Sequence, residues 1–168
     1  MTNHTWKFFR AGGTDQVRLE SSQDILSLEQ LDQKLWVALS CPVRGLEGDT
    51  QTLELIDTDR DGRIRVPEIL AAVRWAGSIL KDLGELRKGS DTLPLAAIND
   101  ATDEGRQVLE AARQILANLG KADAKTICVA DTSDTVRIFA QTKFNGDGIV
   151  PAESAKDEPT RKAIQDVI

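Results

Sequence analysis

The sequence has few of the residues that most enzyme and redox sites need. It contains one histidine, His4, two cysteines, Cys41 and Cys128, and no tyrosine. Because the histidine stands near the start of the sequence without neighbouring cysteines, neither a Ser/His/Asp set nor a zinc cluster is indicated. Neither cysteine has a base close in sequence, and no glycine-rich phosphate loop is present. Together these absences predict that the protein is not an enzyme.

Long apolar runs and an excess of positive charge are also missing. No stretch approaches the roughly 20 apolar residues that span a bilayer. The net charge of -6 would repel nucleic acids and anionic membranes, so neither is expected as a partner. The two distant cysteines and the polar start favour a reducing, cytoplasmic setting, with both thiols buried as small apolar groups. A length of 168 residues with 40% hydrophobic content predicts a single domain over 1–168.

The most informative stretch is residues 57–68, which place acids on alternate positions, then a glycine, and then a fourth acid. A calcium ion takes six to eight oxygens at roughly 2.3 to 2.6 Å, and a twelve-residue EF-hand loop supplies them from positions 1, 3, 5, 7, 9 and 12. Gly62 stands at position 6, where the chain turns sharply. The candidate metal ligands are Asp57, Asp59, Asp61, the backbone carbonyl of Arg63, and Glu68 with both carboxylate oxygens.

Position 9 departs from this pattern, since Arg65 offers no anionic ligand there. Two other interpretations of the stretch fit less well. An ordinary Asp/Gly turn accounts for the glycine but not for Glu68 at the required distance. A haloacid dehalogenase type of phosphatase also has Asp-x-Asp after an apolar strand, but Asp61 stands where that family prefers threonine or valine. The chain also lacks the alternating strands and helices of an α/β sheet.

The flanking sequence predicts mostly helices. Residues 88–94 have the composition of a loop, and the short apolar run 126–129 fits either a strand or an extended connector. The expected elements are a β-hairpin over 1–20, a helix from Ser27 to Cys41, an intact helix–loop–helix over 49–83 with Asp49 as cap and Pro67 in the first turn of the exiting helix, an inserted helix over 102–120 capped by Thr102, and a degenerate EF-hand-like unit over 131–168 that ends in a helix beginning at Asp157.

The degenerate unit contains a second, weaker loop at residues 143–154. With Gly148 aligned to Gly62, Val150 takes the strand position that would face Ile64. EF-hand loops commonly pair through such a two-stranded ribbon. The sequence therefore predicts a companion for the first loop, with a simple turn as the alternative.

The ligand positions of the second loop are poorly filled. Lys143 at position 1 has no lone pair for a metal, and Ser154 replaces the acid at position 12, one residue after Glu153. Asn145 and Asp147, with Glu153, form at best a weak site. We do not expect this loop to hold a metal ion.

The first loop resembles those of the EF-hand calcium-binding superfamily. Together with residues 31–36 and 144–148, it is also similar to the amino-terminal region of a bacterial family of larger EF-hand proteins with no assigned activity. The resemblance implies calcium as the ligand and suggests that this chain is part of a longer one. The expected fold is mainly α, with paired EF-hand-like units, an inserted helix and a short N-terminal hairpin. The expected function is calcium binding in a structural or regulatory role. The alternative is a structural or protein-interaction domain of a larger bacterial protein, in which the metal only stabilises the fold.

Overall fold

The computed structural model describes residues 4–139 and 152–167. The chain divides into two compact units, Met1–Gly89 and Ser90–Ile168, and each is described by itself. Within the described residues, three separate two-stranded antiparallel sheets accompany the helices. The fold is therefore mixed α/β, and the expectation of a mainly α fold whose strands are confined to an N-terminal hairpin is wrong. The single domain over 1–168 stays a prediction.

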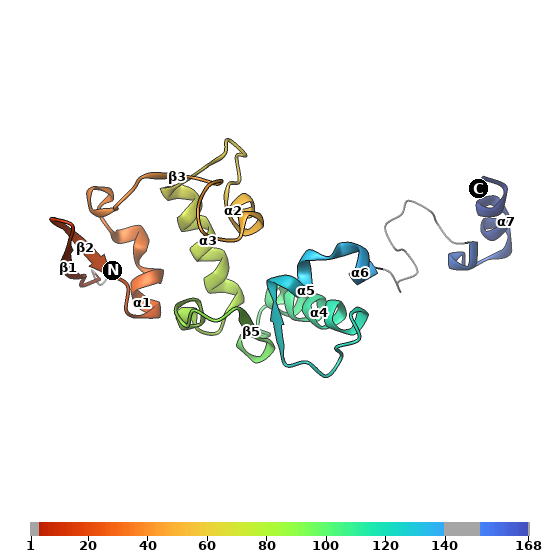
Figure 1. Cartoon of the computed structure of the whole chain (residues 1–168). Helices are drawn as coiled ribbons and strands as arrows, with labels where there is room; N and C mark the ends of the chain where they lie inside the picture. Colours follow the sequence, from red (N-terminus) through yellow and green to blue (C-terminus); the bar gives the residue numbers. More distant parts are fainter. Residues whose placement is uncertain (1–3, 140–151, 168) are drawn as a thin grey trace. The chain divides into compact units, whose positions relative to one another are not determined.

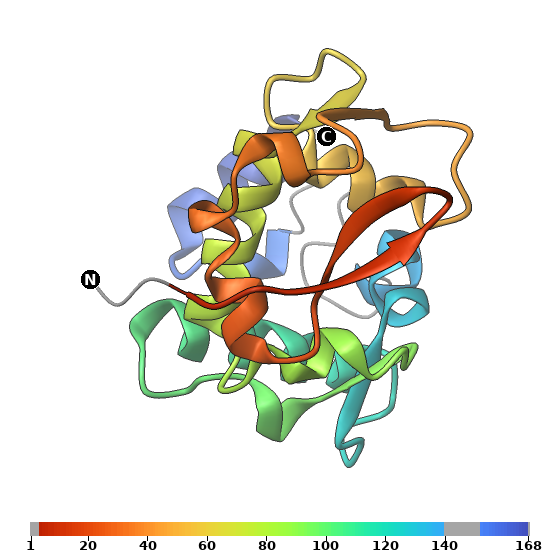
Figure 2. The same ribbon diagram turned by 90° about the vertical axis from the view of Figure 1, so that its left-hand side faces the viewer.

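The first unit opens with the expected hairpin, which is the two-stranded ribbon of Figure 2. Strand β1 (Lys7–Ala11) pairs with β2 (Thr14–Arg18), and Ala11 stands opposite Thr14. Gly12 and Gly13 both have positive φ, 57° and 82°, the requirement of the tight hairpin turn that matches the twist of its strands.

The helix predicted from Ser27 to Cys41 is wrong. Helix α1 (Ser22–Leu26) begins earlier because the Ser21 side chain accepts a hydrogen bond from the Asp24 amide, and the Asp24 carboxylate accepts one from the Ser21 amide. Two short 3₁₀ turns follow, and Asp32 starts the second by accepting a hydrogen bond from the Lys34 amide. The apolar stripe is nevertheless partly buried, at Leu28 and Leu31.

The loop of interest lies between two helices of this unit. Helix α2 (Thr50–Ile56) is capped by Asp49 as expected, and α3 (Val66–Ile79) has Pro67 in its first turn. Helix α3 packs against both α1 and α2 (Figure 1). It ends at Ile79 instead of near Gly84, and a 3₁₀ helix occupies Leu83–Arg87.

A short strand pair ties the loop to the preceding segment. Strand β4 (Arg63–Arg65) pairs antiparallel with β3 (Ser40–Pro42), so that Ile64 faces Cys41. The partner of Ile64 that the structure describes is thus Cys41, and the predicted pairing of Ile64 with Val150 stays a prediction because Val150 lies outside the described residues. Ile64 is only 2% exposed, so its apolar pairing with Cys41 fixes the end of the loop in the core.

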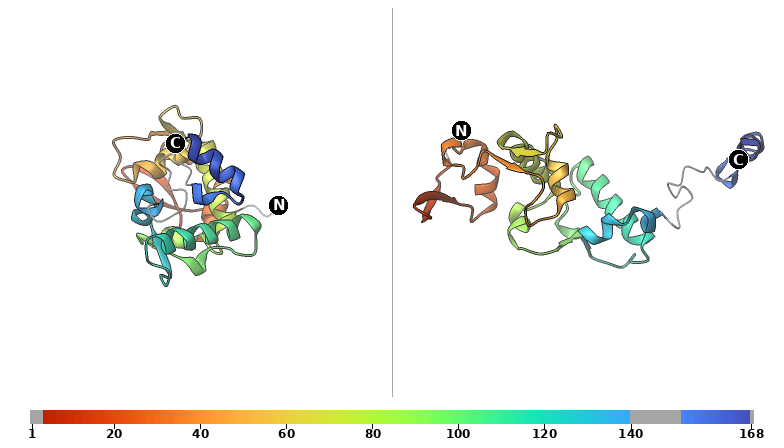
Figure 3. Two further views of the ribbon diagram at one scale, coloured as in Figure 1. Left: turned by 90° about the vertical axis from the view of Figure 1, so that its right-hand side faces the viewer. Right: turned by 45° about the horizontal axis from the view of Figure 1, so that its top comes forward.

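The second unit has its own strand pair. Strand β5 (Thr92–Pro94), in a segment predicted as loop, pairs antiparallel with β6 (Thr126–Cys128). Helix α4 (Asp103–Asn118), capped by Thr102 as expected, packs against α5 (Val129–Ser133) and α6 (Thr135–Phe139) (Figure 3). Helix α7 (Glu158–Val167) follows Asp157, whose carboxylate accepts a hydrogen bond from the Thr160 amide. None of the described helices is both long and apolar enough to cross a membrane.

The two units repeat one backbone arrangement, which the sequence patterns did not reveal. We call residues 40–79 the first motif and residues 92–133 the second motif. In each, a three-residue strand ending in proline pairs with a later strand centred on isoleucine, which a helix follows at once. One further hydrogen bond extends each ribbon by the same step, from the Val43 amide to the Gly62 carbonyl and from the Leu95 amide to the Lys125 carbonyl. Helix α4 thus stands before the second strand–helix pair. Its predicted place as an insertion between two EF-hand-like loops stays a prediction, because most of the second loop lies outside the described residues.

Candidate metal centre

The loop between α2 and β4 is shaped by its own first aspartate. Asp57 is 6% exposed and accepts hydrogen bonds from the Gly62 amide at 2.9 Å and the Asp61 amide at 3.2 Å. Gly62 has a φ of 81°, and Arg60 adopts the left-handed region as well, with a φ of 58°. Such φ values suit glycine and are uncommon for arginine. The hydrogen bonds that the Asp57 carboxylate accepts hold the backbone in this turn.

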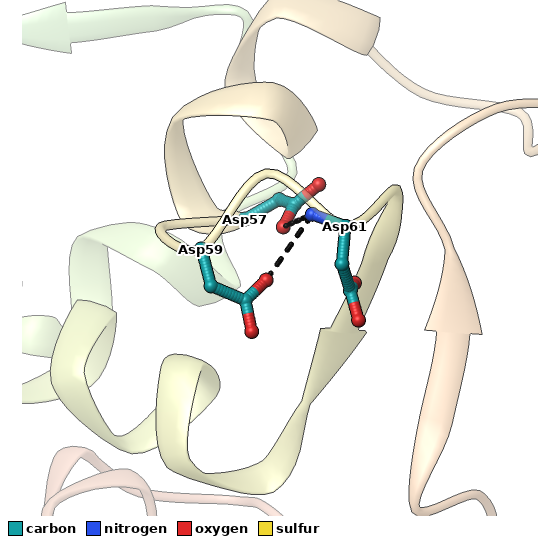
Figure 4. Close-up of side chains that lie close together, drawn as sticks. All are labelled: Asp57, Asp59 and Asp61. Atoms are coloured by element: carbon teal, nitrogen blue, oxygen red, sulfur yellow. Dashed lines mark hydrogen bonds between the residues drawn. The ribbon is translucent and has the colours of Figure 1, made fainter.

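The three aspartates come together as the spacing predicts. One side-chain oxygen from each of Asp57, Asp59 and Asp61 lies within 4.8 Å of the others (Figure 4). The Asp61 amide donates to both Asp57 and Asp59, at 3.2 Å each, and this fixes the two carboxylates on one side of the loop. Two ligands at 2.3 to 2.6 Å from one calcium ion lie at most about 5 Å apart. The spacing of these oxygens therefore fits a single such ion.

Glu68 lies apart from this cluster of three. Its side chain is nearly buried, and one carboxylate oxygen accepts a hydrogen bond from the Thr58 amide at 2.8 Å. The other oxygen accepts from the Arg65 amide at 2.8 Å and so caps the first turn of α3. The carboxylate links the two ends of the loop through backbone amides. Its predicted bidentate role at an ion stays a prediction.

Arg63 contributes to the loop through groups other than its carbonyl. Its amide donates to Asp61 at 2.9 Å, and its side-chain Nε donates to the Ser40 hydroxyl at 2.7 Å across the strand pair. These bonds orient the backbone at position 7. The use of its carbonyl as a ligand stays a prediction.

Arg65 is the feature that the sequence pattern did not place. Its guanidinium lies 2.5 Å from an Asp61 oxygen and 3.8 Å from an Asp59 oxygen. The hydrogen bond and the charge of Asp61 raise the pKa of Arg65 above its ordinary value. Position 9 thus supplies a counter-charge to two candidate ligands, and a metal ion at Asp61 would compete with it.

Most of the second loop lies outside the residues that the structure describes. Lys143, Asn145 and Asp147 lie outside the described residues, and of the Glu153 side chain nothing is described. A 3₁₀ turn at Ala152–Ser154 follows. The expectation that Asn145, Asp147 and Glu153 do not hold a metal ion stays a prediction.

Both cysteines are free thiols, and both are half-buried where burial was expected. Cys41 lies in β3, whereas the Cys128 thiol donates to Asp131 at 3.1 Å. His4 stands 2.8 Å from Asp24 and contacts the edge of Trp6.

Comparison with known proteins adds no further identification. No family model matches the chain, and it has no match among curated proteins or solved structures. The candidate site therefore rests on the loop itself.

Proposed function

We propose that the protein binds one calcium ion through residues 57–68. The observation that carries the proposal is the gathering of the Asp57, Asp59 and Asp61 carboxylates within a span suited to one ion, on a loop whose turn is made by Asp57 and Gly62. Hard, oxygen-only ligands of this kind suit calcium or magnesium, and a flexible loop with several carboxylates favours calcium. Glu68 and the Arg63 carbonyl would complete the ligand set.

The ion would act mainly through charge. Three carboxylates this close repel one another, and a divalent cation removes that repulsion. Arg65 already offsets part of it, so the gain on binding is smaller than in a loop without an arginine at position 9. We expect an affinity no better than the sensor range, with a dissociation constant of roughly 10⁻⁷ to 10⁻⁵ M.

A structural role for the ion is the form of the proposal that we favour. Calcium sensors of the calmodulin kind open a methionine-rich groove, and this chain has Met1 as its one methionine. Ile64 is anchored against Cys41 in the core, and Glu68 joins the two ends of the loop. Calcium would therefore stabilise the first unit without a large opening of α2 from α3. The proposed setting is the cytoplasm, in line with two free thiols.

A second candidate is an interaction domain of a larger protein, in which the metal only stabilises the fold. Its support is the exposure of apolar side chains in the first unit, where Val37 and Leu55 are each 81% exposed. The partner would be another protein or the rest of a longer chain. We propose no catalytic activity, and the negative net charge gives no support to nucleic acid or an anionic membrane as partner.

Calorimetric calcium titration tests the proposal, with the wild type beside Glu68→Gln and Asp59→Asn. The wild type should bind one ion, and both variants should bind at least tenfold more weakly, since each removes one ligand charge. Asp91→Asn, which removes an exposed acid outside the loop, is the matched control and should bind as the wild type does.

No binding at millimolar calcium would refute the proposal, and two ions per chain would show that residues 143–154 bind as well. Dye binding and thermal melting of the same proteins, with and without calcium, separate a structural role of the ion from a regulatory one. A raised melting temperature without new apolar surface supports a structural ion, whereas a large new apolar surface contradicts it.

A further inference from the structure

The second motif contains a nearly buried acid that the proposed function does not use. Asp131 is 7% exposed and accepts three hydrogen bonds. They come from the Cys128 amide at 3.0 Å, the Cys128 thiol at 3.1 Å and the Lys121 ammonium at 2.5 Å. A carboxylate removed from water costs free energy unless a charge and hydrogen bonds satisfy it. Here Lys121 supplies the charge.

Asp131 occupies the place in its motif that Glu68 occupies in the first. Each acid lies three residues after the last residue of the strand and accepts from the amide of that residue, Cys128 or Arg65. Each also accepts a hydrogen bond from the residue ten positions earlier. In the first motif that donor is the Thr58 backbone amide, whereas in the second it is the Lys121 side chain.

In the second motif, the positions that correspond to the three aspartates hold residues without side-chain ligands. Counting back from Asp131, the places of Asp59 and Asp61 are taken by Ala122 and Ala124, and that of Gly62 by Lys125. The place of Asp57 is taken by Gly120, which ends α4 with a φ of 74°. The motif has kept the acid at the end of its loop but has lost the other three carboxylates.

The backbone fixes the lysine where it is needed. The Lys121 amide donates to the Leu116 carbonyl at 2.7 Å, immediately after the turn at Gly120. This bond satisfies a carbonyl in the last turn of α4 and holds the start of the lysine side chain beside the helix end. The ammonium then reaches Asp131, and that contact is the main cause of an Asp131 pKa lowered to about 2.

We propose that the Lys121 ammonium is the resident cation of the second motif, so that this motif assembles without a metal ion while the first takes one. The comparison with calcium rests on the proposed function, but the role of Lys121 does not. Glu68 accepts from the backbone amides of Thr58 and Arg65 and would gain a positive partner from the proposed calcium ion, whereas Asp131 already has one that is covalently attached to the chain. Calcium is therefore expected to leave the second motif unchanged.

Amide hydrogen exchange in the full chain, measured in the presence of a chelator, tests the role of Lys121 independently of calcium binding. Lys121→Met keeps the length of the side chain and removes its charge, whereas Lys121→Arg keeps the charge. We expect exchange at residues 126–131 to accelerate about tenfold or more in Lys121→Met and by less than about threefold in Lys121→Arg. Residues 63–68 should be unaffected in both. Unchanged exchange in Lys121→Met, or equal acceleration in the two variants, would overturn the proposal.

A double variant and the addition of calcium test two further consequences of the proposal. If Lys121→Met does not fold, the double variant with Asp131→Asn should restore folding, because no unpaired buried charge remains. Failure of that rescue contradicts a role through charge. Millimolar calcium should not slow the exchange of Lys121→Met, and restored protection at residues 126–131 would mean that the motif accepts a metal after all. A wild type that binds no calcium would refute the proposed function and leave the exchange result standing.

Discussion

The two motifs share a backbone arrangement and differ in the charged side chains that lie on their loops. In the first, three aspartates gather on the loop and an arginine from the strand lies against one of them at 2.5 Å. In the second, the aspartates are replaced by two alanines and a glycine, and a lysine lies against the remaining acid at 2.5 Å. The acid at the end of the loop is the part common to both. It caps the following helix from its third position, so it is needed for local structure before any metal is considered.

This difference separates two functions that one residue carries in the first motif. Glu68 is both a helix cap and a candidate ligand, whereas Asp131 is a cap whose charge is already matched. Helix lengths change in the opposite sense, since α2 has 7 residues and α4 has 16, while α3 has 14 and α5 has 5. The strand pair and the capping acid are therefore the parts that the two motifs have in common. The helices around them differ in length.

The largest expected effect comes from moving the lysine into the first motif. Thr58 corresponds to Lys121, and its hydroxyl already lies 3.4 Å from a Glu68 oxygen. In Thr58→Lys the ammonium should reach Glu68 and weaken calcium binding by more than about tenfold, because the ion then competes with an attached charge. Calorimetry measures the affinity, and Thr58→Met is the control of similar length without charge. An equal loss in both variants would mean that size, not charge, is responsible.

A smaller effect of opposite sign is expected at position 9. Arg65→Gln removes the guanidinium from Asp61 and Asp59 and should strengthen calcium binding about threefold to fivefold, since the exposed ion pair it breaks is weak. Arg44→Gln removes another exposed arginine of the first unit, paired with Glu54 at 3.5 Å, and should leave the affinity unchanged. Calcium titration of the two variants shows whether the gain in affinity is specific to Arg65. An unchanged affinity in Arg65→Gln would contradict the competition inferred from the distances.

The sequence was most informative where one short segment decides the structure. The turn at Gly12–Gly13, the caps Asp49 and Thr102, and the gathering of three aspartates all depend on neighbours within a few residues. The helix predicted from Ser27 failed for a local reason as well. The Ser21 and Asp24 pair is a stronger start signal, and Ser21 lies six residues before Ser27.

What the sequence did not reveal depends on pairing between distant segments. Strands β3 and β5 have three residues each, too few for a periodic pattern, and their partners lie more than twenty residues away. The second motif was missed because its ligand positions hold Ala122 and Ala124, so the search for acids passed over it. An isoleucine two residues before a helix and an acid at the third position of that helix were the signals that could have found it. The contacts of Arg65 with Asp61 and Asp59 were not predicted, because position 9 alone does not say which way a side chain turns.

The smallest expected effect is the pH dependence of stability that Asp131 contributes. The Asp131 pKa is lowered from 3.8 to about 2 by Lys121 first and then by Cys128, the two groups that donate to it. A depressed pKa means that the stabilisation is fully present above about pH 4 and is lost as the pH falls through 2. Denaturant unfolding of the wild type and Asp131→Asn between pH 5 and 2 measures this, since the amide does not titrate. The difference in free energy of unfolding between the two proteins should shrink as the pH falls. A difference that stays constant over this range would show that the Lys121 contact contributes nothing through charge.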